Sequence, residues 1–170
     1  RYPAYRFVLA VAPSVPDSIY AEGLRGSSIT VVKGRTYDLL RTARGALVTS
    51  GTATLETALF GVPEVVCYSG SALNVWIAKR LVDIKFISLV NLIMDREVVR
   101  ELIQQDLNVP ALCAELERIM TAGPYRSAME NDLAQLRAMI GVPGAAAKAA
   151  AAVWKRLGST AEAPLAALNF

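Results

Sequence analysis

The residues Leu47-Val48-Thr49-Ser50-Gly51-Thr52-Ala53-Thr54-Leu55-Glu56 pass from a β-branched strand through a small polar turn into an amphipathic helix. The turn at Ser50-Gly51-Thr52 leaves backbone N–H groups free at a helix N-terminus, where the helix dipole favours phosphate. Glu56 follows Thr52 by one helical turn on the same side, within reach of the hydroxyl pair of a sugar. This stretch therefore predicts a nucleotide site.

A plainer interpretation of this stretch stays open. Ser and Thr are common N-cap residues, so Thr52 could be an N-cap and Glu56 a solvated helix residue. Leu55, Leu59 and Val62 recur at i, i+4 and i+7. This spacing predicts that an apolar stripe holds the helix against a sheet and leaves the Thr52 side free for a ligand.

The composition narrows the classes of function. With 170 residues, 54% of them hydrophobic, the chain can bury one sizeable α/β core and is too short for two large domains. Its 18 basic and 15 acidic residues give a net charge of +3. This mild excess fits an anionic ligand or an anionic lipid and is not typical of a nucleic-acid-binding protein.

The sequence contains no His, which removes the commonest general base and the commonest metal ligand. We therefore expect any proton transfer to use a carboxylate, and we expect no metal site and no cofactor.

Cys67 and Cys113 lie in apolar runs, which predicts buried, reduced thiols and fits a cytosolic compartment. No run approaches the length of a transmembrane helix. Because the chain begins at Arg1 directly before a predicted strand, we expect it to be a fragment whose earlier half is missing.

Strands and helices alternate in the first half of the chain. The pattern predicts strands at 5–12, 29–32, 46–49, 64–68 and 86–88, with helices at 17–24, 36–43, 52–61 and 71–82. This alternation of short apolar strands with helices predicts an α/β fold, a Rossmann-like parallel sheet with helices on both faces. Residues 91–97 are then predicted to form a polar loop, and helices follow at 110–120, 124–140 and 144–157. We expect one domain over 1–158 and a weakly structured tail over 159–170.

In open α/β sheets, ligands bind at the carboxyl ends of the strands. The turn at Ser50-Gly51-Thr52 lies at such an end, and the 91–97 loop is predicted to lie there too. Asn91 could then contact a base or sugar, and Arg96 could pair with a phosphate. The alternative for Arg96 and Glu97 is a local surface ion pair at a helix start.

Three groups of residues resemble the carboxy-terminal half of lipid-A-disaccharide synthases over most of residues 7–120. The first group is Ser50-Gly51-Thr52-Ala53-Thr54-Leu55-Glu56-Thr57-Ala58-Leu59 with Gly61-Val62-Pro63. The second is Trp76-Ile77-Ala78-Lys79-Arg80-Leu81, and the third is Ile87-Ser88-Leu89-Val90-Asn91-Leu92-Ile93 with Arg96-Glu97-Val98-Val99-Arg100-Glu101-Leu102. The first group alone would indicate the broader class of two-domain glycosyltransferases, whereas the combination indicates this synthase.

The resemblance implies the nucleotide-binding, carboxy-terminal domain of a metal-independent, inverting GT-B glycosyltransferase. Such an enzyme joins a UDP-activated diacylglucosamine to diacylglucosamine 1-phosphate and releases UDP. It also implies a set of nucleotide-binding residues. Ser50, Gly51 and Thr52 would hold the diphosphate, with Thr54 in the same turn; Glu56 would hold the ribose; and Asn91, Arg96 and Glu97 would line the donor side of the cleft.

The resemblance places the catalytic base in the missing amino-terminal domain, with Glu97 as a weak internal candidate. Without that domain, the chain should bind nucleotide and not catalyse transfer. The helix predicted at 71–82 carries Trp76, Lys79 and Arg80, and is either a membrane-interface helix or a core helix with two solvated cations. We expect a cytoplasmic enzyme peripheral to the inner membrane of a Gram-negative bacterium.

Two alternatives belong to other classes of function. The chain could be a non-catalytic module that binds nucleotide sugars and serves a separate subunit. It could also be a nucleotide-sugar epimerase, but such an enzyme would be expected to use His, and the sequence has none.

Overall fold

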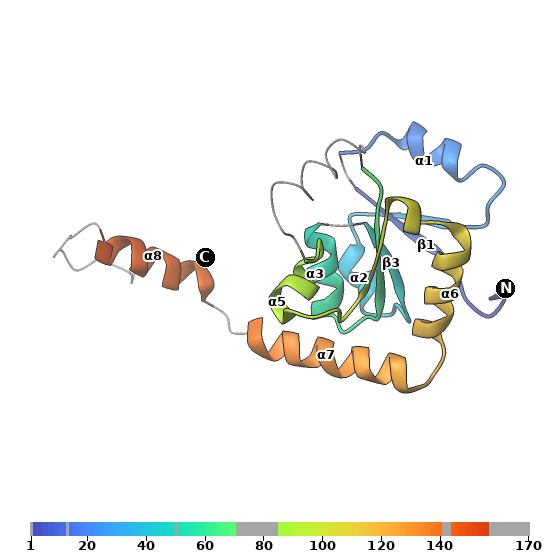
Figure 1. Cartoon of the computed structure of the whole chain (residues 1–170). Coiled ribbons are helices and arrows are strands. Elements are labelled where there is room, and N and C mark those ends of the chain that lie inside the picture. The colour runs from blue at the N-terminus through green and yellow to red at the C-terminus, as the bar shows by residue number, and fades with distance from the viewer. Residues whose placement is uncertain (1, 13, 50, 71–84, 141–143, 157–170) are drawn as a thin grey trace. The chain divides into compact units, whose positions relative to one another are not determined.

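The computed structural model describes residues 2–12, 14–49, 51–70, 85–140 and 144–156 (Figure 1). The chain divides into two compact units, Arg1–Arg137 and Ala138–Phe170. The strands are β1 (Val8–Val11), β2 (Thr30–Lys33), β3 (Ala46–Thr49), β4 (Glu64–Tyr68) and β5 (Arg100–Ile103). The helices are α1 (Asp17–Gly23), α2 (Thr36–Leu40), α3 (Thr52–Leu59), α5 (Leu89–Met94), a 3₁₀ turn η1 (Gln104–Asp106), α6 (Val109–Met120), α7 (Pro124–Ile140) and α8 (Ala145–Arg156).

The five strands form two parallel sheets. One sheet pairs β1 with β2, and the other has the order β3-β4-β5. In the second sheet Val48 pairs with Val66, and Val66 in turn with Glu101. The expected α/β fold with parallel strands is confirmed.

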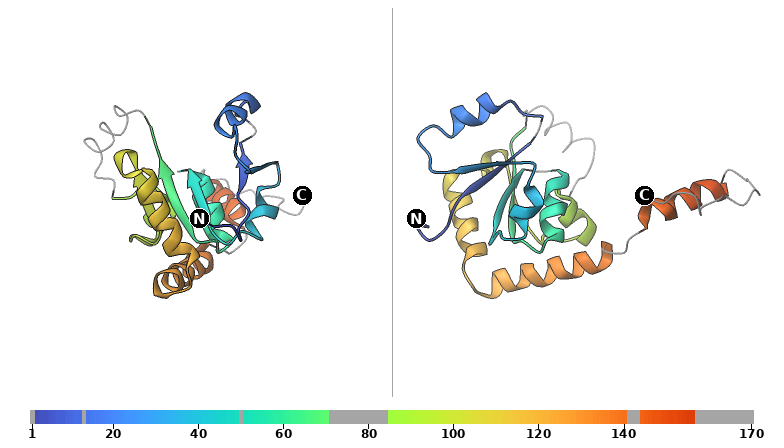
Figure 2. Two further views of the ribbon diagram at one scale, coloured as in Figure 1. Left: turned by 90° about the vertical axis from the view of Figure 1, so that its right-hand side faces the viewer. Right: turned by 180° about the vertical axis from the view of Figure 1, so that it is seen from behind.

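Helices cover both faces of the three-stranded sheet. The strands β3, β4 and β5 lie side by side in the same order as in the sequence. Right-handed connections between them therefore place α3 and α5 on the same face of the sheet. These two helices pack against each other, while α6 packs on β4 and β5. Figures 1 and 2 show α6 on one side of the strands and α3 on the other. Val65 and Val66 point to opposite faces of β4, and both are fully buried.

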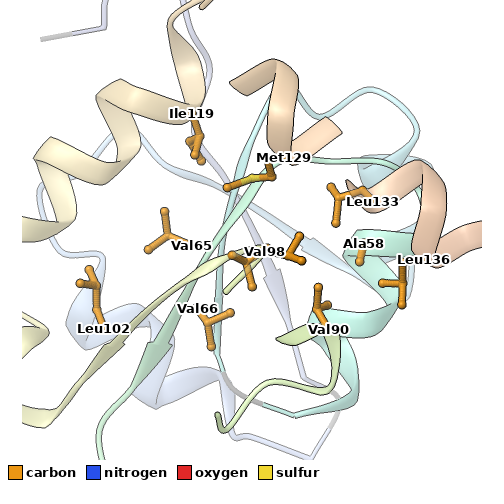
Figure 3. Close-up of a cluster of buried hydrophobic side chains, with 11 residues drawn as sticks. Ala58, Val65, Val66, Val90, Val98, Leu102, Ile119, Met129, Leu133 and Leu136 are labelled. Carbon is orange, nitrogen blue, oxygen red and sulfur yellow. The ribbon is translucent and has the colours of Figure 1, made fainter. Parts of the chain in front are cut away.

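The hydrophobic core lies between this sheet, α3, α5, α6 and α7. Figure 3 shows Val65 beside Ile119 of α6 and Val66 toward Val90 of α5. Helix α7 contributes Met129, Leu133 and Leu136. Their spacing of four and three residues places them on one face of the helix, which explains why α7 packs along the sheet despite its polar composition.

Arg126 anchors the start of α7 at the amino-terminal edge of the sheet. Its side chain is 7% exposed. Its Nη1 donates to the carbonyl of Arg44, 3.1 Å away and just before β3, and to the carbonyl of Ile119. Its Nε pairs with Glu130 Oε1 at 2.7 Å. A buried guanidinium thus satisfies carbonyl groups from two other segments, and this fixes α7 across the edge where the strands begin.

Most of the predicted elements are confirmed. The strands at 46–49 and 64–68 and the helix at 124–140 have the predicted bounds, and the helix predicted at 36–43 is shorter. The strand predicted at 86–88 is wrong, because these residues lead into α5, and the strand β5 was not predicted. The helix predicted at 71–82 and the tail at 159–170 lie outside the described residues. Both cysteines are free, and they are partly buried where full burial was predicted.

The second unit contains α8. Its described side chains are exposed, including Val153 and Trp154 at 59% and 42%. Lys155 and Arg156 stand in its last turn, where positive charge stabilises the helix dipole. The single domain predicted over 1–158 stays a prediction.

Candidate nucleotide site at the start of helix α3

The turn between β3 and α3 exposes a helix N-terminus. Gly51 is the N-cap residue, with φ 144° and ψ −161°. L-residues rarely adopt this φ, so the backbone itself requires glycine here. A Cβ at Gly51 would meet no atom of the described residues within 4 Å, its chain neighbours aside. Ser50, the first residue of the predicted anion site, lies outside the described residues.

The N-terminus of α3 has no cap from the described part of the chain. No side-chain hydrogen bond caps it, and its first turn carries no acidic residue. Thr52 is the first helical residue and is exposed, so its interpretation as an N-cap is wrong. The described residues therefore leave the first N–H groups and the positive end of the helix dipole uncovered, as an anion site requires.

Thr54 holds the turn in place from inside. It is fully buried, and its hydroxyl donates to the carbonyl of Gly51 at 2.8 Å. This bond orients the Gly51 peptide. Thr54 therefore shapes the turn, and its buried hydroxyl does not face the open side of the turn.

Glu56 is the acidic residue nearest the turn on α3. It is partly buried, and no described residue forms a hydrogen bond or ion pair with its carboxylate. It stands four residues after Thr52, so the two side chains share one side of the helix. An acceptor without a described partner thus lies one turn from the open N–H groups.

The sequence predicted that Asn91 lies in a polar loop, and this prediction is wrong. It belongs to α5, is fully buried, and uses its whole amide on the protein. Its Nδ2 donates to Val99 O and Glu101 Oε1, both at 2.8 Å. Its Oδ1 accepts the N–H groups of Val98 and Val99 at 2.8 and 3.0 Å. Asn91 therefore fixes the chain just before β5.

Arg96 and Glu97 pair with protein groups away from the turn. Arg96 Nη2 lies 2.7 Å from Asp132 Oδ1 on α7, and it also donates to Gln135. Glu97 Oε1 lies 2.9 Å from Arg100 Nη1. The two residues do not pair with each other, so the local ion pair considered from sequence is also wrong.

The direction of α5 explains this difference. Helix α5 runs back against the strand direction, so Arg96 and Glu97 stand just before β5, at the amino ends of the strands. The turn at Gly51 follows β3 at the carboxyl ends. Strands of four residues separate these edges by about 13 Å at 3.3 Å per residue. The structure therefore brings Thr52 and Glu56 together and does not bring Arg96 and Glu97 to them.

Glu97 instead borders a surface pocket of about 310 Å³ lined by charged groups. There Arg118 lies 3.6 Å from the centre of the Tyr125 ring and 2.5 Å from Glu115. Tyr125 donates to Glu115, and burial raises the pKa of its hydroxyl to about 12. The arginines here are already paired, so the pocket offers little free positive charge.

Two carboxylates with structural roles were not predicted from the sequence. Glu101 accepts the N–H groups of Ile87 and Ser88, both at 2.9 Å, in addition to Asn91. Glu64, in β4, is fully buried, and neither of its oxygens has a hydrogen-bond partner in the described part of the chain. Burial raises its pKa to about 9, so the carboxyl is protonated at neutral pH. The signal for Glu64 was its place next to Val65-Val66-Cys67, inside an apolar run.

Comparison with known proteins identifies the family. The family model described as lipid-A-disaccharide synthetase matches residues 2–140. The chain belongs to this family. Lipid-A-disaccharide synthases similar to it include that of Syntrophus aciditrophicus, 42% identical over 122 residues, which are 72% of this chain and 32% of the relative. The synthase of Geobacter sulfurreducens is 34% identical over 160 residues, covering 93% of this chain and 42% of the relative. That of Myxococcus xanthus is 33% identical over 157 residues, covering 91% of this chain and 41% of the relative.

The chain therefore spans less than half the length of these members of the lipid-A-disaccharide synthetase family. Among the described helices, none is both long and apolar enough to cross a membrane. The same described residues hold no cluster of three or more His, Cys, Asp or Glu side chains able to bind a metal ion.

Proposed function

We propose that this chain is the nucleotide-binding part of a lipid A disaccharide glycosyltransferase. It binds the UDP moiety of UDP-2,3-diacylglucosamine, and the full-length enzyme transfers the sugar to 2,3-diacylglucosamine 1-phosphate. The observation that carries the proposal is the N-terminus of α3 at Gly51, which no described side chain caps, with the Glu56 carboxylate, unpaired among the described residues, one turn away. Membership in the lipid-A-disaccharide synthetase family supports the choice of substrates.

The proposed chemistry uses the helix N-terminus in place of a metal ion. The acceptor hydroxyl attacks the anomeric carbon, the bond from that carbon to the diphosphate breaks, and UDP leaves with the bonding electron pair. The N–H groups at Gly51 and Thr52, which follow Ser50 in the sequence, stabilise the negative charge that develops on the diphosphate. Glu56 accepts hydrogen bonds from the ribose hydroxyls and orients the nucleotide.

In this proposal the other predicted site residues do not contact the nucleotide. They stabilise the surrounding fold. Thr54 orients the Gly51 peptide, and Asn91 fixes the chain between α5 and β5. Arg96 ties α5 to α7 through Asp132. A base from the domain outside this chain removes the proton of the acceptor hydroxyl. Both substrates carry acyl chains, so we place the enzyme at the cytoplasmic surface of the inner membrane.

Calorimetric titration with UDP, with and without EDTA, tests the proposal. We expect weak binding, in the millimolar range or tighter, that EDTA does not change. Gly51→Ala should abolish binding because a Cβ is strained at this φ. Gly26→Ala is the matched control, since Gly26 also has positive φ (77°) but lies in the turn after α1. Absence of heat with millimolar UDP, or equal loss in both variants, would contradict the proposal.

A further inference from the structure

The neighbours of helix α3 show which side of the helix carries Glu56. Glu56 and Phe60 stand four residues apart and share one side of the helix. The ring of Phe60 lies 5.5 Å from the ring of Tyr37 on α2. Leu55 and Ala58 share a different side, since Ala58 lies in the core cluster with α5 and Leu55 packs against that cluster (Figure 3). Glu56 therefore lies on the α2 side of α3, away from α5.

The ends of β4 and β5 lie on the α5 side of the same helix N-terminus. Thr49, Cys67 and Leu102 form one row across β3, β4 and β5. Gly51 follows this row by two residues after β3, and Gln104 follows it by two residues after β5. The ends of β3 and β5 are two strand spacings, or about 10 Å, apart. The diphosphate separates the ribose from the sugar, so a donor with its ribose on the α2 side extends its sugar toward the ends of β4 and β5.

Gln104 has a backbone conformation that favours glycine. Its φ is 54°. Among the described residues, Asp95 is the other non-glycine residue with positive φ. Asp95 is the C-cap of α5, where the left-handed conformation is common. Gln104 instead opens the 3₁₀ turn directly after β5. Because glycine would be less strained at this position, the strain indicates a role for the Gln104 side chain.

The side chain of Gln104 joins the ends of β4 and β5. It is partly buried, and its Nε2 donates to Gly70 O at 2.8 Å. The Tyr68 hydroxyl lies beside the same glycine, since a Cβ at Gly70 would be 2.7 Å from it. No described residue donates a hydrogen bond to Oε1 of Gln104. One half of the amide is thus bound to the protein, and the other half leaves an acceptor at the carboxyl edge of the sheet.

We propose that Gln104 recognises the sugar of the UDP-activated donor, an inference that rests on the proposed function. Nε2 holds the Gly70 peptide at the end of β4, and Oε1 accepts a hydrogen bond from one of the sugar hydroxyls that carry no acyl chain. An amide suits this position because its oxygen is neutral. A carboxylate there would accept the same hydrogen bond but would repel the neighbouring diphosphate.

Calorimetric titration of the chain with UDP and with UDP-N-acetylglucosamine tests this inference. The second ligand adds a sugar with free hydroxyls and has no long acyl chains. The natural chain should bind UDP-N-acetylglucosamine about two- to tenfold more tightly than UDP, the net effect of one hydrogen bond. Gln104→Leu should bind the two ligands equally and keep the affinity of the natural chain for UDP.

Two further variants separate recognition of the sugar from effects on folding. Gln104→Gly removes the same side chain and relieves the strain of the positive φ, so it should give the same result as Gln104→Leu. Gln105→Leu is the matched control. It replaces the exposed glutamine of the same turn and should keep the preference for UDP-N-acetylglucosamine. Urea unfolding shows whether each variant is folded.

The outcomes distinguish this inference from the proposed function. Equal binding of both ligands by the natural chain would overturn the inference, as would a preference for UDP-N-acetylglucosamine that survives in both Gln104 variants. An equal loss of affinity for UDP and for UDP-N-acetylglucosamine in these variants would assign Gln104 to the structure of the edge and would also overturn it. Absence of UDP binding by the natural chain would contradict the proposed function, and this inference with it.

Discussion

The side-chain nitrogen of Asn91 lies 2.8 Å from Oε1 of Glu101, and the Glu101 carboxylate also accepts the N–H groups of Ile87 and Ser88. One carboxylate therefore joins the segment before α5, the first turn of α5 and the start of β5. Asn91 itself holds Val98 and Val99. The position of α5 on its face of the sheet depends on this network of hydrogen bonds.

Glu101→Gln should destabilise the chain by about 1.5–3 kcal/mol, because one of its two carboxylate oxygens becomes an NH₂ group that faces backbone donors. Urea unfolding at pH 7 measures the change. Glu97→Gln is the matched control. It removes an exposed carboxylate paired with Arg100 and should cost about 0–1 kcal/mol. Equal losses in the two variants would show that the Glu101 network contributes nothing specific.

Glu64 should make stability fall as pH rises. Its pKa is about 9 in the folded chain, against 4.5 ordinarily, because burial disfavours the charged form. Below pH 4.5 both states are protonated, and there is no penalty. Between pH 4.5 and 9 the unfolded state releases the proton and the folded state keeps it, so this carboxyl lowers the free energy of unfolding by up to about 1.4 kcal/mol per pH unit.

Glu64→Gln should remove this dependence, and its stability advantage over the natural chain should grow from pH 5 to pH 8. Urea unfolding at several pH values measures it. Glu22→Gln, which removes an exposed carboxylate, should keep the slope of the natural chain. A slope unchanged by Glu64→Gln would mean that Glu64 is ionised in the folded state and has found a partner.

Glu56→Ala should weaken UDP binding about 10- to 100-fold, or roughly 1.5–3 kcal/mol, because charge-assisted hydrogen bonds to the ribose are lost. Calorimetry with UDP and with 2′,3′-dideoxyuridine diphosphate separates this effect from a change in folding. The natural chain should discriminate between the two ligands, and the variant should not. A matching loss of affinity for the dideoxy ligand would remove the ribose assignment.

Glu97→Gln should keep transferase activity in the full-length enzyme. The Glu97 carboxylate lies at the amino edge of the sheet beside Arg100, away from the turn at Gly51. Disaccharide formation from the UDP-diacylglucosamine donor measures it, and the chain alone should show no turnover. Loss of activity in a folded Glu97→Gln enzyme would restore Glu97 as the base. Turnover by the chain alone would place the whole catalytic site within it.

Local patterns in the sequence were sufficient to predict most helices and strands. The strand at 46–49, the turn at Gly51 and the helix that begins at Thr52 depend on β-branched residues, a glycine with positive φ and an apolar stripe, all within a few residues. The family could be predicted for the same reason, since its motifs are continuous in the chain.

Tertiary structure decided which residues share an edge of the sheet. Asn91 was predicted to be a loop residue because it is polar. In the structure it is fully buried, and its side-chain oxygen accepts the N–H groups of Val98 and Val99. Arg96 has the chemistry of a phosphate ligand, but α5 runs against the strands and carries it to Asp132 at the opposite edge. Glu64 has a raised pKa because segments distant in sequence remove it from water. The sequence by itself determines the chemistry of each side chain and the local structure formed with its neighbours along the chain. The direction in which a helix runs and the exclusion of water from a side chain arise from contacts between residues far apart in the chain.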